Sequence, residues 1–104
     1  MNDQAYGLSA EDIDRICEVF AHYPAVVEVQ IYGSRALGKQ RPGSDIDLTL
    51  KGNGLDLKTL NRISNDLDDL LLPYIFDLSI YSQVKNDALL EHIERVGRVF
   101  YEKI

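Results

Sequence analysis

The sequence of 104 residues lacks the features that mark exported, membrane-spanning or disulfide-bonded proteins. Its single cysteine, Cys17, excludes an internal disulfide framework and a zinc site built from several cysteines. The longest apolar runs, such as Leu70 to Leu72, are far too short for a helix that spans a bilayer. The segment Met1 to Gln4 shows neither a basic start nor an apolar stretch. We therefore expect no secretory signal, no membrane association and a cytoplasmic location.

Positive charge is also scarce in this sequence. Lysine and arginine together number 11 against 17 aspartates and glutamates, which gives a net charge of −6. This balance disfavours binding to the bare phosphates of a nucleic acid, so we expect no direct nucleic-acid partner. An acidic protein can still bind a nucleotide where metal ions bridge carboxylates and phosphates.

The hydrophobic pattern predicts one globular domain over residues 1–104, with helices packed on a sheet. Expected helices cover Ala10 to Ala21, a segment from Asp56 to about Leu71, and Asp87 to Val96, with a short helical turn at Arg35 to Leu37. Expected strands cover Val26 to Tyr32, Asp45 to Leu50, Tyr74 to Tyr81 and a short edge segment, Val99 to Tyr101.

Burial expectations follow from the same periodicity. The leucine stripe from Leu57 to Leu71 recurs at three- and four-residue steps and is expected to face the core. Cys17 lies on the apolar stripe of the first helix and is expected to be a small core residue. His22 and His92 are isolated from other metal-ligating residues and are expected to be ordinary helix-surface residues.

Three aspartates carry the clearest chemical signal. Asp45 and Asp47 are two residues apart on a predicted strand, so they project from one face about 6.6 Å apart. Asp77 occupies a position of the same polar-face type on the next strand. Aspartate is disfavoured in strands and like charges repel, so solvated surface residues are the weaker explanation. A pair or triad of carboxylates that binds Mg²⁺ explains the pattern better.

The dipeptide Gly33-Ser34 precedes the aspartate pair. It lies where a predicted strand passes into a helical turn, and glycine allows the backbone to approach a ligand closely. Amides at a helix start and the serine hydroxyl favour an anion such as a triphosphate. Gly-Ser alone is usually just a turn; its position upstream of the aspartates gives it meaning.

The combined motif identifies a resemblance. Gly33-Ser34, ten further residues and Asp45-x-Asp47 resemble the signature of the DNA polymerase β-like nucleotidyltransferase superfamily, and Asp77 in the segment FDLSIY matches its third carboxylate. The chain looks like a minimal nucleotidyltransferase, the catalytic palm alone. The resemblance implies an α/β (α+β) fold, with a mixed sheet of three to four strands and helices packed on it.

The resemblance also implies chemistry: Mg²⁺-dependent transfer of a nucleoside monophosphate from a donor, here ATP, with release of pyrophosphate. Asp45, Asp47 and Asp77 would be the catalytic and metal-binding residues, with two ions expected. Gly33 and Ser34 would bind the nucleotide phosphates. Arg35 is a further candidate for a phosphate contact, although an ion pair with an aspartate is an alternative.

The acceptor of the nucleotide depends on this resemblance as well. Minimal nucleotidyltransferases are commonly paired with helical HEPN-domain proteins in toxin–antitoxin modules, where they adenylylate a tyrosine of the HEPN ribonuclease. We therefore expect an antitoxin whose partner is a HEPN toxin encoded next to it. Two alternatives stay open: a non-catalytic module that neutralises its partner by contact, and an enzyme that modifies a small hydroxylated molecule such as an aminoglycoside.

Overall fold

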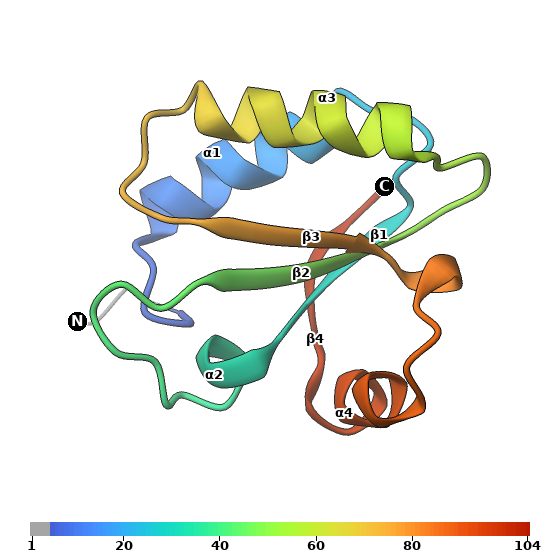
Figure 1. Ribbon diagram of the computed structural model, residues 1–104. Coiled ribbons are helices and arrows are strands. Elements are labelled where there is room, and N and C mark those ends of the chain that lie inside the picture. The colour runs from blue at the N-terminus through green and yellow to red at the C-terminus, as the bar shows by residue number, and fades with distance from the viewer. Residues whose placement is uncertain (1–4) are drawn as a thin grey trace.

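The computed structural model describes residues 5–104, so Met1 to Gln4, on which the expectation about a secretory signal rests, lie outside the described residues. A four-stranded sheet forms the centre of the fold, with helices on both faces (Figure 1). The strands are β1 (Glu28–Tyr32), β2 (Ile46–Lys51), β3 (Phe76–Ile80) and β4 (Arg98–Glu102). The helices are α1 (Ala10–Ala21), α2 (Gly33–Ala36), α3 (Leu57–Asp68) and α4 (Asp87–Val96), with a 3₁₀ turn η1 (Tyr81–Gln83).

The sheet is mixed, as the resemblance implies. Its strand order is β3-β2-β1-β4, in which β2 and β3 run parallel while β1 is antiparallel to both β2 and β4. The end of β1 therefore lies beside the start of β2, which lies beside the start of β3. We call this the start edge, defined by Tyr32, Asp47 and Asp77 at matching register positions.

The core lies on the face of the sheet that α1 and α3 cover (Figure 1). Strand alternation places Val29, Ile31 and Leu48 on this face, all fully buried. Helix α1 contributes Ile16 and Phe20, and α3 contributes Ile63 and Leu67, at the helical spacing that the sequence predicts. Side chains cap the starts of two helices, since Ser9 caps α1 by accepting Asp12 N–H and Asp56 caps α3 by accepting Thr59 N–H.

The expected leucine stripe of α3 is too long at both ends. The helix ends at Asp68, and Leu71 adopts a left-handed φ of 58° that turns its side chain outward, 89% exposed. Leu57, the first residue of the helix, is 65% exposed. The expectation that these two leucines face the core is therefore wrong: Leu71 lies beyond the end of the helix, and Leu57 is exposed in its first turn.

Smaller differences concern element ends. Helix α2 begins at Gly33, directly after β1, rather than at Arg35. Strand β3 ends at Ile80 because Tyr81 begins the 3₁₀ turn, and Asp45 lies just before β2.

Cys17 is half-buried against the core and its thiol donates a hydrogen bond to Phe100 O, which supports the expected packing role. Burial, followed by the Asp14 charge, raises the pKa of this thiol to about 11.

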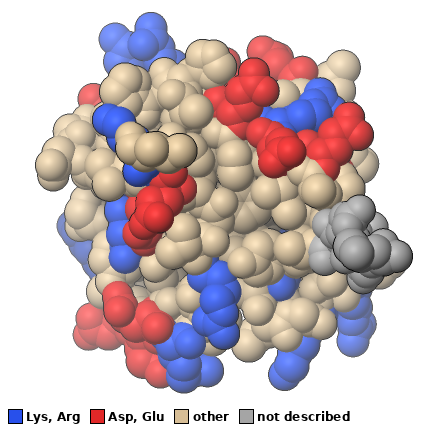
Figure 2. Space-filling view, turned by 180° about the vertical axis from the view of Figure 1, so that it is seen from behind, with Lys and Arg blue, Asp and Glu red and all other residues tan. Residues whose placement is uncertain are grey.

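Acidic and basic side chains are interspersed on the face shown in Figure 2, and neither sign covers it continuously. No helix within residues 5–104 has the length and apolarity needed to cross a membrane.

Candidate functional site

The start edge brings the predicted aspartates together. Asp47 is paired with Tyr32 of β1 on one side and with Asp77 of β3 on the other. Neighbouring strands lie about 4.8 Å apart, and residues at matching positions point to the same face. This face is opposite the one covered by α1 and α3. Asp45 lies exposed just ahead of β2, two residues from Asp47.

Asp47 is the electrostatic centre of this edge. Its side chain is half-buried, and burial raises the pKa of the carboxyl, with further increases from the charges of Asp77 and Asp45. Positive charge on the protonated form of His92 and on Arg35 acts in the opposite direction and lowers this pKa. The ionised form of Asp47 is therefore disfavoured by its surroundings, and a cation at this edge would relieve the repulsion.

The donor chemistry at the start edge fits a hard cation such as Mg²⁺. Carboxylate oxygens are the ligands that Mg²⁺ takes from proteins, usually one or two together with substrate phosphates. Among residues 5–104, however, no group of three or more His, Cys, Asp or Glu side chains is arranged to hold a metal ion by itself. Asp47 and Asp77 share a face at matching positions, and Asp45 lies just before β2.

Gly33 packs directly against the Asp47 carboxylate. A Cβ atom at this position would lie 2.3 Å from Asp47 Oδ2, and the backbone φ is +75°. Both the clash and the left-handed backbone restrict the position to glycine. The motif glycine therefore allows the turn after β1 and the carboxylate of β2 to come into contact.

The hydrogen bonds of the Gly33-Ser34 turn modify the expectation from the sequence. Gly33 N–H donates to His92 Nε2 at 3.2 Å, so this amide is not free for an anion in the observed arrangement. The Ser34 carbonyl accepts Lys39 N–H at 2.8 Å, which closes the turn after α2. Phosphate binding by Gly33 and Ser34 stays a prediction, and Ser34 provides the side-chain donor.

Arg35 occupies a structural position. It is 4% exposed, and its guanidinium donates to Ser44 O through Nε and Nη2 and to Tyr6 O through Nη1. The guanidinium carbon also lies 5.2 Å from the centroid of the Tyr74 ring. Its donors thus tie together segments before α1, before β2 and before β3. A phosphate contact from Arg35 stays a prediction. In this structure the contacts of Arg35 hold the segments around the site together.

His92 is the residue that sequence reasoning missed. The expectation that it is an ordinary surface residue is wrong, because it is half-buried, bonded to Gly33 and in edge contact with the Tyr32 ring, 6.1 Å between centroids. The contact with Gly33 spans 59 positions of sequence. One signal was available: His92 continues the apolar face of α4, three residues after Leu89 and four before the buried Val96.

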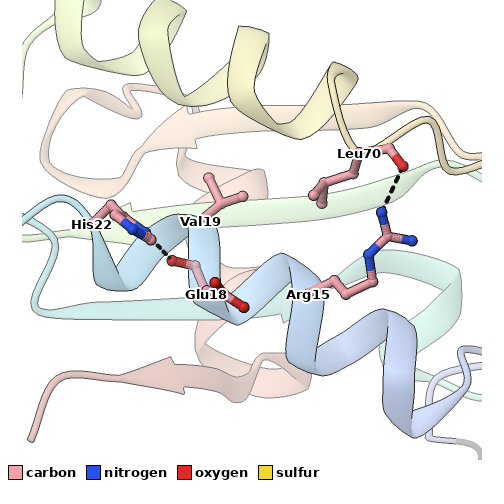
Figure 3. A pocket seen from close by; sticks show the side chains of 5 residues that line it. All are labelled: Arg15, Glu18, Val19, His22 and Leu70. Carbon is pink, nitrogen blue, oxygen red and sulfur yellow. Dashed lines mark hydrogen bonds between the residues drawn. The ribbon is translucent and has the colours of Figure 1, made fainter.

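Two hollows lie away from the aspartates. One, of about 270 Å³, lies on the side of the sheet that α1 and α3 cover (Figure 3). It is lined by Arg15, Glu18, Val19, His22 and Leu70. Arg15 Nη2 donates to Leu70 O across it at 3.0 Å. The other, of about 350 Å³, lies at the far end of β3 and includes Leu60, Ser79 and Leu89. Neither hollow includes Asp45, Asp47 or Asp77.

Several solved structures with this fold come from toxin–antitoxin complexes. A chain of a toxin–antitoxin complex with AMP-PNP matches with a TM-score of 0.73 and 19% identity, over 88% of this chain and 73% of that chain. A chain from the complex of tri-AMPylated Shewanella oneidensis HEPN toxin with MNT antitoxin matches with a TM-score of 0.66 and 16% identity, over 89% and 71% of the two chains. At such identities the likeness shows the fold. No curated protein matches the sequence.

The family comparison covers most of the chain. The family described as "Polymerase beta, Nucleotidyltransferase" matches residues 14–104, which include the motif glycine and serine and all three aspartates. The fold, the mixed sheet and the placement of the motif agree with this match. The chain therefore belongs to the polymerase β nucleotidyltransferase family.

Proposed function

We propose that this protein transfers AMP from ATP to a tyrosine hydroxyl of a HEPN toxin and thereby acts as its antitoxin. The observation that carries the proposal is the start edge itself, where Asp47 and Asp77 stand at matching positions beside the Gly33 turn. Membership of the nucleotidyltransferase family supports the reaction type.

The nucleotide would bind between the Gly33-Ser34 turn and the aspartates. Asp45, Asp47 and Asp77 are the residues that would hold Mg²⁺, and Ser34 would donate to a phosphate oxygen. When bound, Mg²⁺ would neutralise the carboxylates and polarise the phosphates. The glycine at position 33 lets the turn approach the Asp47 carboxylate closely enough for one ligand to contact both.

The transfer step requires an acceptor hydroxyl beside the aspartates, on the face of the sheet opposite α1 and α3. The hydroxyl oxygen forms a bond to the α-phosphorus of ATP, the bond from that phosphorus to the bridging oxygen breaks, and pyrophosphate leaves. The proton of the hydroxyl goes to the Asp77 carboxylate, which is exposed and faces the same side as Asp47. Asp47, held by its half-buried position, would orient the donor.

A protein acceptor is favoured over a small molecule by the surface around the start edge. The two hollows described above lie elsewhere on the chain, and neither is lined by one of the three aspartates. Ile75 O accepts Ile46 N–H, which places the 69% exposed Ile75 at the same edge. Leu71, also exposed, belongs to the same loop between α3 and β3. Exposed apolar side chains of this kind are suited to protein contact.

The HEPN identity of the partner is supported by the structural neighbours. The Shewanella oneidensis structure contains a tri-AMPylated HEPN toxin with an MNT antitoxin, and another neighbour carries AMP-PNP. The alternative of neutralisation by contact alone predicts the same complex without transfer. Rapid transfer to kanamycin-like compounds without a second protein would instead favour the small-molecule alternative.

Co-expression with the neighbouring HEPN toxin separates catalysis from contact. Wild type should rescue growth, whereas Asp47→Asn and Asp77→Asn should co-purify with the toxin and fail to rescue growth. These changes are isosteric and leave the exposed loop unchanged. Full rescue by both variants, with AMP on the toxin absent by intact-mass analysis, would contradict the catalytic proposal and favour contact alone.

A further inference from the structure

We propose that His92 is a positioning residue for the nucleotide site: its Nε2 holds the Gly33-Ser34 turn in register with Asp47 by accepting Gly33 N–H. The inference rests on the proposed function, in which this turn contacts the phosphates of ATP. It assigns a role to α4, the helix that covers the other side of the sheet from α1 and α3 (Figure 1).

The hydrogen bond defines the state of the ring. Gly33 N–H donates to His92 Nε2 at 3.2 Å, so Nε2 carries no proton and acts as an acceptor. In neutral histidine the proton then lies on Nδ1. A side chain without an acceptor at this point would leave the Gly33 amide without this partner.

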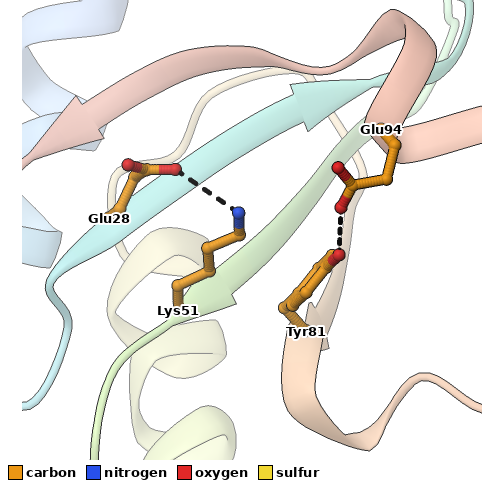
Figure 4. A network of polar contacts seen from close by, with 4 residues as sticks. All are labelled: Glu28, Lys51, Tyr81 and Glu94. Atoms are coloured by element: carbon orange, nitrogen blue, oxygen red, sulfur yellow. Dashed lines mark hydrogen bonds and ion pairs between the residues drawn. The ribbon is translucent and has the colours of Figure 1, made fainter. Parts of the chain in front are cut away.

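The imidazole is itself held in place. Its ring stands at 80° to the Tyr32 ring with centroids 6.1 Å apart, and Tyr32 is only 7% exposed. The next residue, Ile93, is buried and fixes this part of α4. On the same helix Glu94 accepts the Tyr81 hydroxyl, near the Glu28–Lys51 ion pair of the sheet (Figure 4). His92 is thus a fixed point against which the turn is held.

The turn needs an external anchor because Gly33 has no side chain. Glycine can change from its φ of +75° to other backbone conformations at little cost. The close contact between Gly33 and Asp47 Oδ2, however, is kept only if the turn moves little. Since the amide of Gly33 is directed toward α4, its hydrogen bond sets the distance between the turn and the carboxylate. Loss of this bond would let the turn move relative to Asp47, and both would contact the same nucleotide.

The test uses two substitutions at His92 and one control. Gln can offer a side-chain oxygen near the position of Nε2, whereas Leu cannot accept a hydrogen bond, so His92→Gln should rescue what His92→Leu loses. The matched control is His22→Leu, at the end of α1 on the other side of the sheet. The probe is Mg²⁺ with AMP-PNP, and its affinity is measured by titration calorimetry.

The expected result has two parts. In the free protein, NMR should detect a scalar coupling across the hydrogen bond between Gly33 ¹⁵N and His92 ¹⁵Nε2. His92→Leu should weaken AMP-PNP binding by about 3- to 10-fold, the range for one hydrogen bond. His92→Gln should restore most of this affinity, and His22→Leu should leave it unchanged.

The outcomes distinguish this inference from the proposed function. Absence of the coupling, wild-type affinity in His92→Leu, or equal weakening in the Leu and Gln variants would overturn the role of His92, even where wild type binds AMP-PNP. Failure of the wild type to bind AMP-PNP with Mg²⁺ would contradict the proposed function and the inference together. A loss in His92→Leu that Gln rescues would support the positioning role over a purely structural one.

Discussion

Asp47 and Asp77 occupy matching positions on the parallel strands β2 and β3, so two carboxylates project side by side from one face of the sheet. Asp47 is half-buried there, and burial together with the charges of Asp77 and Asp45 raises its pKa. An arrangement that disfavours the ionised carboxylate costs the free protein stability. This arrangement lies where the motif residues meet, and its effect on the free energy of unfolding can be measured.

The first prediction concerns the pH dependence of stability. Because the folded-state pKa of Asp47 is raised, its ionisation destabilises the fold as pH rises from the unfolded value, about 3.9, through the folded value. Asp47→Asn removes this effect. The variant should be more stable than wild type at pH 7 by a few tenths of a kcal/mol, on the scale of about 0.2–1 kcal/mol for partly solvated charges. The difference should shrink toward pH 3, as measured by urea denaturation.

A magnesium titration provides the control for this prediction. Mg²⁺ should stabilise wild type with AMP-PNP present and should have little effect on Asp47→Asn. An Asp47→Asn variant that is less stable than wild type at pH 7 would contradict the proposed repulsion.

The second prediction compares two glycines with similar backbone angles. Gly33 and Gly38 have φ of +75° and +72°, but a Cβ at Gly38 would meet nothing within 4 Å. Gly38→Ala should therefore show only the backbone cost, about 1–2 kcal/mol. Gly33→Ala should lose about 1–3 kcal/mol more through its clash with Asp47, and its transfer rate should fall about 100-fold as the carboxylate moves.

Thermal unfolding and single-turnover transfer would measure these two effects separately. Equal stability and equal rates in the two alanine variants would show that the contact between Gly33 and Asp47 contributes neither to the fold nor to transfer.

The third prediction tests the role of Arg35. Its buried guanidinium donates to Ser44 O and Tyr6 O, and lysine cannot reproduce this fork. Arg35→Lys should lower the free energy of unfolding by about 1–3 kcal/mol. Affinity for AMP-PNP, measured below the unfolding temperature, should change less than 3-fold. Unchanged stability with a large loss of affinity would instead identify Arg35 as a phosphate ligand.

The fourth prediction concerns the exposed loop beside the aspartates. Ile75→Ser should weaken the complex with the HEPN toxin by about 10- to 100-fold, the expected effect of losing one buried aliphatic side chain. Leu57→Ser is the matched control, because Leu57 is similarly exposed but lies at the opposite end of α3. Surface-based binding assays with both variants would measure the difference. Equal weakening, or none, would place the partner surface elsewhere.

The sequence allowed much of this fold to be predicted, because its signals are local. Periodicity located α1 and α4, and alternation assigned the buried faces of β1 and β2. The matching positions of Asp47 and Asp77 were predictable as well, since both lie on the polar face of a predicted strand.

Contacts between distant segments were not predictable in this way. The bond between Gly33 and His92 depends on how α4 packs over the sheet, and no local pattern specifies that packing. Arg35 follows the motif serine and is therefore easily interpreted as a phosphate ligand. Its carbonyl partners come from Tyr6 and Ser44, and only the folded chain brings these together. Leu71 does not face the core as expected, because its left-handed backbone conformation interrupts the helical pattern.

The most direct test of the central claim is transfer of label from ATP to the partner protein. The purified protein, its HEPN toxin, Mg²⁺ and ATP labelled at the α-phosphate are incubated, and label on each protein is followed with time. The account predicts label on the toxin with wild type, and a rate about 10²–10⁴-fold lower with Asp77→Asn, whose affinity for AMP-PNP stays near that of wild type. Transfer at the wild-type rate by Asp77→Asn, or no label on the toxin with wild type, would contradict it.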